Sequence, residues 1–401
     1  MLTRTQKLAL ASASIGTGLI YSLNSNLLPL ILINHTSSAF LIGVVIGFAQ
    51  FLGVLIPPII GTVSDNTWTR FGRRKPYIIV FFPLTIVMIL IVFLVGRYTV
   101  FQFSFMSSFL LLAMCIALLY AFFNIWNSPY TALLPDLTEP AERGETSGYL
   151  QAFNILGTIF AFMIGAAIWE QYPLVTFGIF AAVIAISASI TIVTVQEKKA
   201  IQLQEKASMT SIIKDFVKEK EFMKLMFTSM FWWFGIGTLM AFFVLFAKES
   251  LGLAESSALI FMGIFTIILV AFAVPSGIIA DKYGKKRVLS LGVFLAAIGL
   301  LMGAFSSNLY LLYVGMGITG LGFGAILVLN FALTADLLPK GKEGKFMGLG
   351  NIFSAAPQAA AAPIMGFIIS VFNNDYRMIF YIAPIALAAG LICLQFVDIK
   401  T

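Results

Sequence analysis

Long apolar stretches, separated by short polar connections, follow one another along the whole chain. A helix that crosses the hydrocarbon core of a bilayer needs about 20 mostly apolar residues, and the sequence contains twelve stretches of this kind. The pattern therefore predicts an all-α membrane protein with twelve transmembrane helices. The stretches cover approximately residues 8–32, 40–62, 77–96, 105–133, 148–169, 173–195, 222–247, 257–280, 288–305, 310–333, 346–371 and 378–396.

The composition agrees with this pattern and excludes several classes of protein. Of the 401 residues, 60% are hydrophobic and only 11% are charged, whereas a soluble domain has about 25% charged residues. With a mean hydropathy of +0.97, too little polar surface is available to cover a water-soluble globule. A soluble enzyme, a nucleic-acid-binding module and a disulfide-stapled secreted domain are therefore excluded.

The distribution of lysine and arginine predicts the topology. Connections on the cytoplasmic side of membrane proteins carry an excess of these residues. If the N-terminus is cytoplasmic, 22 of the 25 basic residues fall on that side, and only Arg97, Lys248 and Arg377 fall outside. We therefore expect an integral, multi-pass protein of the cell membrane with both termini in the cytoplasm.

An internal repeat divides the chain into two halves. ALLPDLTEPAERGETSGYLQAF, from Ala132, matches ALTADLLPKGKEGKFMGLGNIF, from Ala332, at seven of 22 positions. A G-x-x-x-D pattern also occurs twice, at 61–65 and at 277–281. Each is followed by a basic run, GRRK at 72–75 and GKKR at 284–287. We predict an N-terminal six-helix bundle (1–195), a cytoplasmic linker (196–221) and a C-terminal six-helix bundle (222–401).

Two loops carry a resemblance to a known family. GTVSDNTWTRFGRRKPYII (61–79) resembles the loop signature of the major facilitator superfamily, and more narrowly of its sucrose-transporter and glycoside-pentoside-hexuronide symporter branches. PYTALLPDLTEPAERG (129–144) is similar to the PY-x-AL…L motif of the second branch. The resemblance implies the major facilitator fold, with two parallel six-helix repeats that move a solute by alternating access.

The resemblance also implies a conformational latch on the cytoplasmic side, made of charged residues that hold the halves together and release when that side opens. In an alternative interpretation, the basic run at 73–75 only anchors the topology and binds lipid headgroups. The predicted latch residues are Asp65, Arg73, Arg74, Asp136, Arg143, Asp281 and Asp336.

The spans contain neutral polar side chains but no charged residue near their middle. A carrier of anions or cations would normally expose an opposite charge in its cavity, so the pattern favours a small neutral solute. Amides donate to and accept from hydroxyl groups, and an indole face packs against a sugar ring. A sugar or glycoside is therefore expected, although each amide could instead join helices. The candidate substrate-binding residues are Tyr21, Asn24, Gln50, Asn124, Asn127, Trp232, Trp233 and Gln358.

Coupling to an ion stays open at this point. The resemblance implies that a proton or sodium ion is co-transported. It would be a partner of the protein in addition to the solute and the membrane lipids. However, the glycoside symporters carry intramembrane acidic residues for the cation, where this chain has Gln50, Asn124 and Asn127. The alternative function is export of hydrophobic or lipid-like compounds. No motif predicts an enzyme, a metal site, a cofactor or ATP binding.

Overall fold

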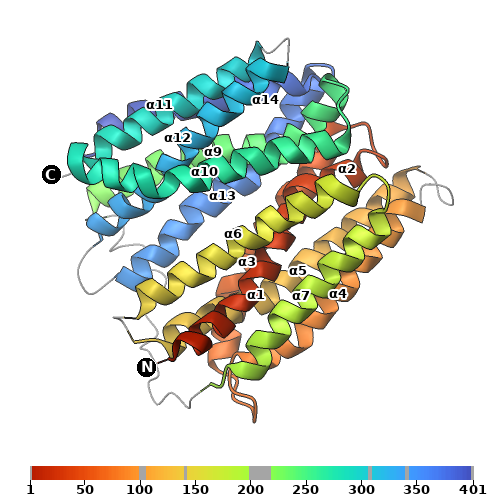
Figure 1. Ribbon diagram of the computed structural model, residues 1–401, viewed down its shortest axis with the longest axis vertical. Coiled ribbons are helices and arrows are strands. Elements are labelled where there is room, and N and C mark those ends of the chain that lie inside the picture. The colour runs from red at the N-terminus through yellow and green to blue at the C-terminus, as the bar shows by residue number, and fades with distance from the viewer. Residues whose placement is uncertain are drawn as a thin grey trace. The chain divides into compact units, whose positions relative to one another are not determined.

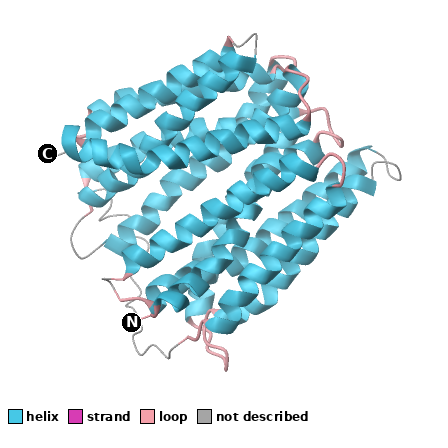
Figure 2. Ribbon diagram, in the orientation of Figure 1, coloured by secondary structure: helices cyan, strands magenta, loops and turns pink. Residues whose placement is uncertain are grey.

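The chain is almost entirely helical wherever the computed structural model describes it (Figure 2). The described residues are 2–98, 105–139, 142–197, 218–305, 309–338 and 343–398. Within them, twelve helical stretches are long and apolar enough to cross a membrane. The prediction of an all-α protein with twelve spans is therefore confirmed.

The chain forms two compact units, and each is described by itself. The first comprises Met1–Leu203 with Glu255–Leu259, and the second comprises Gln204–Ala254 with Ile260–Thr401. Most of the predicted linker, at 198–217, lies outside the described residues.

The first unit contains the first six spans. The first span consists of helix α1, a five-residue π-helix η1 and helix α2, and the other five are single helices. Their bounds are α1 Arg4–Ser22, η1 Leu23–Leu27, α2 Leu28–Leu32, α3 Ala39–Asp65, α4 Lys75–Tyr98, α5 Phe105–Leu137, α6 Arg143–Ile168 and α7 Pro173–Thr194.

The second unit contains the spans of the second repeat except residues Glu255–Leu259 at the start of α10, which belong to the first unit. Its bounds are α9 Lys220–Leu245, η3 Phe246–Ser250, α10 Glu255–Tyr283, α11 Lys285–Ala304, α12 Leu309–Asp336, α13 Glu343–Val371, η4 Tyr376–Met378 and α14 Ile379–Gln395.

Corresponding helices pack in the same way in the two units (Figure 1). In the first unit α1 packs against α6 and α7, and α4 packs against α5 and α7. In the second unit α9 packs against α13 and α14, and α11 packs against α12 and α14. Each set joins the first span of a half to the fifth and sixth, and the third to the fourth and sixth. This equivalence confirms the internal repeat.

Small residues set the close approach of α1 and α6. A Cβ atom at Gly18 would collide with the Asn154 carbonyl, and one at Gly157 would collide with the Ile15 carbonyl. Helices in a bilayer gain little hydrophobic energy by associating, so they depend on packing of this kind and on interhelical hydrogen bonds. This contact holds α1, and the π-helix that follows it, in a fixed place in the unit.

Candidate functional site

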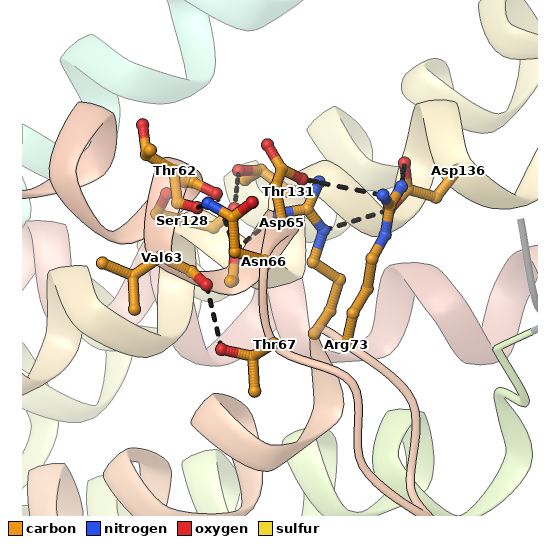
Figure 3. Close-up of polar contacts among 12 residues, drawn as sticks. Thr62, Val63, Asp65, Asn66, Thr67, Arg73, Ser128, Thr131 and Asp136 are labelled. Carbon is orange, nitrogen blue, oxygen red and sulfur yellow. Dashed lines mark hydrogen bonds and ion pairs between the residues drawn. The ribbon is translucent and has the colours of Figure 1, made fainter. Parts of the chain in front are cut away.

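Four of the five predicted latch residues of the first repeat meet in one ionic cluster at the ends of α3 and α5 (Figure 3). Arg73 Nη2 lies 2.6 Å from Asp136 Oδ1, and Arg74 Nε lies 3.0 Å from Asp136 Oδ2. Arg74 Nη2 also lies 2.6 Å from Asp65 Oδ1. The Arg74 side chain is only 7% exposed and that of Asp136 19%. Both arginines therefore have carboxylate partners within the protein. The latch hypothesis expects such partners, whereas binding to lipid headgroups alone would not require them.

The loop before α4 is held in shape by a residue that the sequence analysis missed, Glu197. Its carboxylate accepts hydrogen bonds from the backbone N–H groups of Arg73 (2.9 Å), Arg74 (3.0 Å) and Lys75 (2.7 Å). These donors stand at the N-terminus of α4, where free N–H groups and the helix dipole favour an anion. The carboxylate thus orients the two arginines toward the aspartates.

Gly72 makes this contact possible. Its φ of +107° is a backbone conformation that other residues rarely adopt. A Cβ atom here would also lie 2.6 Å from Cδ of Glu197. The glycine of the GRRK run and a carboxylate just after the sixth span were the signals in the sequence that could have indicated this pairing.

Replacing Glu197 with alanine is expected to lower the free energy of unfolding by about 2 kcal/mol, because three backbone donors lose a charged acceptor. The thermal unfolding midpoint of the purified protein measures this effect. Glu219→Ala is the matched control, since Glu219 is exposed and caps no helix with its side chain. Equal midpoints for the two variants would contradict this role of Glu197.

The second repeat reproduces part of the cluster with different residues. Lys285 Nζ lies 2.6 Å from Asp336 Oδ2, in the place of the Arg73–Asp136 pair. Gly284 has a φ of +93°, as Gly72 does in the first repeat. Lys286 Nζ donates instead to the carbonyls of Gln395 (3.1 Å) and Val397 (2.8 Å), just after the last span. Among the described residues, no ion pair includes Asp281.

Arg143, the remaining latch candidate, does not join the first cluster. It is exposed, and its Nη2 donates to the Pro135 carbonyl at 3.4 Å. The neighbouring acids form an ion pair with Lys7 instead: Nζ lies 2.7 Å from Glu145 Oε2 and 3.3 Å from Glu142 Oε1. Lys7 is 6% exposed, so this pair fastens the start of α1 to the start of α6.

Four of the candidate binding residues in the first unit lie where α5 faces α1 and α3. Asn127 Nδ2 lies 3.4 Å from the Tyr21 hydroxyl, and Asn124 is one helical turn away on the same face of α5. Asn124 is 4% exposed, and its Oδ1 is adjacent to Gly53 of α3. Gln50 lies one turn before Gly53 and has a buried Oε1 without a partner among the described residues.

Asn24 is in the π-helix that interrupts the first span. Pro29 lacks an N–H, so it cannot donate to the Ser25 carbonyl as a continuous α-helix would require. π-Helical turns of this kind are frequent at functional sites. Asn24 is 2% exposed, and its Oδ1 finds no partner within the described part of the chain.

The candidates in the second unit separate into two places. Trp232 and Trp233 of α9 line a small pocket with residues of α10 and α12. Gln358 of α13 does not line it. Its Nε2 donates to the Ser354 carbonyl of its own helix at 3.2 Å, and its Cα faces Gly237 of α9. This arrangement indicates helix packing at Gln358.

Comparison with known proteins identifies the family. Residues 10–392 match the family described as MFS/sugar transport protein, where MFS denotes the major facilitator superfamily. The chain belongs to this family. It is a transporter rather than an enzyme, and the expected superfamily membership is confirmed.

Several curated relatives of this MFS transporter align over part of their length. The isoprimeverose transporter of Lactiplantibacillus pentosus is 24% identical over 327 residues, which cover 76% of this chain and 65% of the relative. Multidrug resistance protein 3 of Bacillus subtilis is 31% identical over 107 residues, 26% of this chain and 20% of the relative. Both alignments span less than two thirds of the relative.

Solved structures share the fold of this MFS transporter over nearly its full length. The crystal structure of the nucleoside transporter NupG aligns with a TM-score of 0.73 at 15% identity. The alignment covers 99% of this chain and 100% of the other. At this identity the likeness confirms the major facilitator fold alone.

Proposed function

We propose that this MFS transporter moves a small neutral solute, a sugar or glycoside, across the membrane by alternating access. The observation that carries the proposal is a set of buried neutral polar atoms in helices that have no charged residue near their middle. Asn24 Oδ1 and Gln50 Oε1 in the first unit have no partner among the described residues, nor do the indole N–H groups of Trp232 and Trp233. Buried polar groups normally find partners, and the hydroxyl groups of a sugar can supply them.

The names of two relatives support a sugar. One is the isoprimeverose transporter already described, and another is a lactose permease of Lactobacillus helveticus, 29% identical over 151 residues. That alignment covers 36% of this chain and 21% of the permease.

The absence of charge within the spans supports transport down the solute gradient. Every Asp, Glu, Lys and Arg of the helices lies near a helix end. Asp65 in α3 and Lys248 in η3 are two examples. Coupling to protons usually requires a buried acid with a raised pKa. The neutral amides Gln50 and Asn124 stand in the second and fourth spans instead.

The ionic cluster serves in this proposal as the latch of the first repeat, on the cytoplasmic side of the cell membrane, with both termini on that side. Asp65 is half exposed, at 52%, whereas Asp136 and Arg74 are largely buried. Asp65 is therefore the partner that can separate from the cluster at the lowest cost, while the Arg74–Asp136 pair stays closed.

Export of hydrophobic compounds remains the second candidate. It is favoured by the apolar lining of the pocket beside Trp232 and by the name of the multidrug resistance relative. A hydrophobic substrate would leave the buried amides of the first unit without partners, which is the reason to rank this function second.

Uptake into liposomes that contain the purified protein tests the proposal. We expect at least one of a panel of radiolabelled pentoses, hexoses and disaccharides to enter faster than into empty liposomes, without any imposed ion gradient. Uptake of none of them, together with uptake of lipophilic dyes, would contradict a sugar carrier and favour the exporter.

A further inference from the structure

A cation rests on an exposed aromatic ring at corresponding places of the two repeats. In the first unit, the Arg70 guanidinium lies 4.7 Å from the centre of the Phe71 ring. In the second unit, Lys282 Nζ lies 5.3 Å from the centre of the Tyr283 ring. The two aromatic side chains are 49% and 57% exposed, and a glycine with positive φ follows each of them directly. The two units therefore carry the same pair, with a different cation and a different ring.

The neighbouring basic residues already have partners within the protein. Arg73 and Arg74 contact the carboxylates of the ionic cluster, and Lys285 contacts an aspartate of its own repeat. Arg70 and Lys282 are exposed instead. The side chain of neither forms an ion pair or a hydrogen bond with any residue that the structure describes. One cation in each repeat is thus left for a partner outside the chain.

A closed turn presents the first of these pairs at the surface. The backbone N–H and carbonyl groups of Thr69 and Gly72 bond to each other in both directions, at 3.0 and 3.1 Å. The Thr69 hydroxyl also donates to the Gly72 carbonyl, at 3.0 Å, and accepts from Phe71 N–H, at 3.2 Å. Arg70 and Phe71 are the central residues of this turn, and Trp68, just before it, is 47% exposed. The backbone therefore holds two aromatic rings and a cation outward.

The length of α10 places the second pair at the level of the lipid headgroups. The 29 residues of this helix extend over about 44 Å at about 1.5 Å per residue. A bilayer has a hydrocarbon core of about 30 Å and measures about 40–45 Å with its headgroups. Tyr283 is the last residue of the helix, on the side that we propose to be cytoplasmic. Tyrosine and tryptophan favour this interface, and cations there meet anionic lipids.

We propose that each cation–aromatic pair binds the headgroup of an anionic phospholipid, so that the protein has one such site in each repeat. The guanidinium of Arg70 or the ammonium of Lys282 donates to the lipid phosphate, and the adjoining ring packs against the glycerol and the upper acyl chains. A zwitterionic lipid fits less well, because its own cation neutralises the phosphate. These sites lie outside the ionic cluster, and they do not depend on which solute is carried.

Native mass spectrometry of the purified protein in detergent counts bound lipids and tests this. We expect the wild-type protein to retain two molecules of phosphatidylglycerol at a concentration at which phosphatidylcholine with the same acyl chains is not retained. Arg70→Gln and Lys282→Gln should each weaken one of the two sites about fivefold, the effect of one cation near anionic lipid. Each single variant should then retain one lipid with the wild-type affinity, and the double variant should retain neither.

Further variants assign the binding to the pairs rather than to the net charge. Phe71→Ser and Tyr283→Ser keep the cation and remove the ring, and each should weaken its site about threefold. Arg143→Gln is the matched control for charge. Arg143 is exposed and donates to a backbone carbonyl, and it has no ring contact among the described residues. This variant should retain both lipids.

Four outcomes would overturn the inference. The first is equal retention of phosphatidylglycerol and phosphatidylcholine. The second is a loss of lipid in Arg143→Gln as large as that in the pair variants, which would indicate a general attraction to a positive surface. The third is full affinity in both ring variants. The fourth is a dimer that persists with lipid and dissociates in the pair variants, which would assign the rings to a second copy of the chain. None of these outcomes affects solute uptake, so the proposed function can stand when this inference fails.

Discussion

Replacing Arg74 with alanine is expected to lower the free energy of unfolding by about 3 kcal/mol, because a largely buried guanidinium loses three charge-assisted hydrogen bonds. The Arg74 guanidinium lies 2.6 Å from Asp65, 3.0 Å from Asp136 and 2.5 Å from the Ser64 hydroxyl. All three contacts of this guanidinium, which is 7% exposed, are lost at once, and only Arg73 remains beside Asp136, at 2.6 Å. Thermal unfolding of the purified variant measures the loss.

Arg70→Ala is the matched control for this prediction. Arg70 belongs to the same loop and carries the same charge, but its guanidinium rests on the exposed ring of Phe71, 4.7 Å from the ring centre. Its removal should change the unfolding midpoint little. If the two alanine variants unfold at the same temperature, the ionic cluster does not stabilise this end of the unit.

Replacing Asn124 with leucine is expected to weaken solute binding by about tenfold or more while leaving stability nearly unchanged. Asn124 Nδ2 donates to the Tyr120 carbonyl of its own helix, at 2.8 Å, so the amide contributes no hydrogen bond between helices that is present in the described structure. An apolar replacement of similar size removes this bond within the helix together with a donor and an acceptor for the solute. Calorimetric affinity for the transported sugar, beside the unfolding midpoint, measures both effects.

Asn154→Leu gives the opposite expected result and is therefore the control. Its Nδ2 donates to Thr17 Oγ1 across α1 and α6, at 2.8 Å, which is the interhelical role that a membrane amide often has. This variant should lose stability and keep its affinity for the sugar. Asn124→Leu with unchanged affinity would remove Asn124 from the binding site.

The repeat made part of the ionic cluster predictable from the sequence. Asp136 and Asp336 match at an offset of 200 residues, and each follows a run of apolar residues that ends at the membrane edge. The basic runs after Gly72 and Gly284 match as well. Because repeats pack alike, a pair such as Arg73–Asp136 implies its counterpart Lys285–Asp336, and both are present.

Other contacts could not be predicted, since they depend on where distant loops meet. Lys7 and Glu145 are 138 residues apart, and nothing in either local pattern indicates the partner. Glu197 stood in a polar stretch that looks like a solvated linker, and only the fold brings it to the N-terminus of α4. A single sequence gives the helices and their ends, but not which ends are neighbours.

The binding residues were the least predictable part for a related reason. Amides within apolar spans were identified correctly as polar exceptions, but composition does not distinguish a binding amide from one that joins helices. Asn154 bonds to Thr17 of α1, whereas Asn124 bonds within α5. The π-helix around Asn24 also left no signal in the apolar pattern, because that pattern gives the length of a span and not the hydrogen-bond register within it.

The central claim is that a neutral solute crosses between helices without charge near their middle, and without an ion; steady-state accumulation tests it most directly. The protein in liposomes is given the sugar identified by the uptake panel, with and without an inward proton or sodium gradient. We predict that the concentration inside rises to that outside and no further under every condition. Accumulation above the outside concentration, driven by either gradient and abolished by an ionophore, would contradict the account.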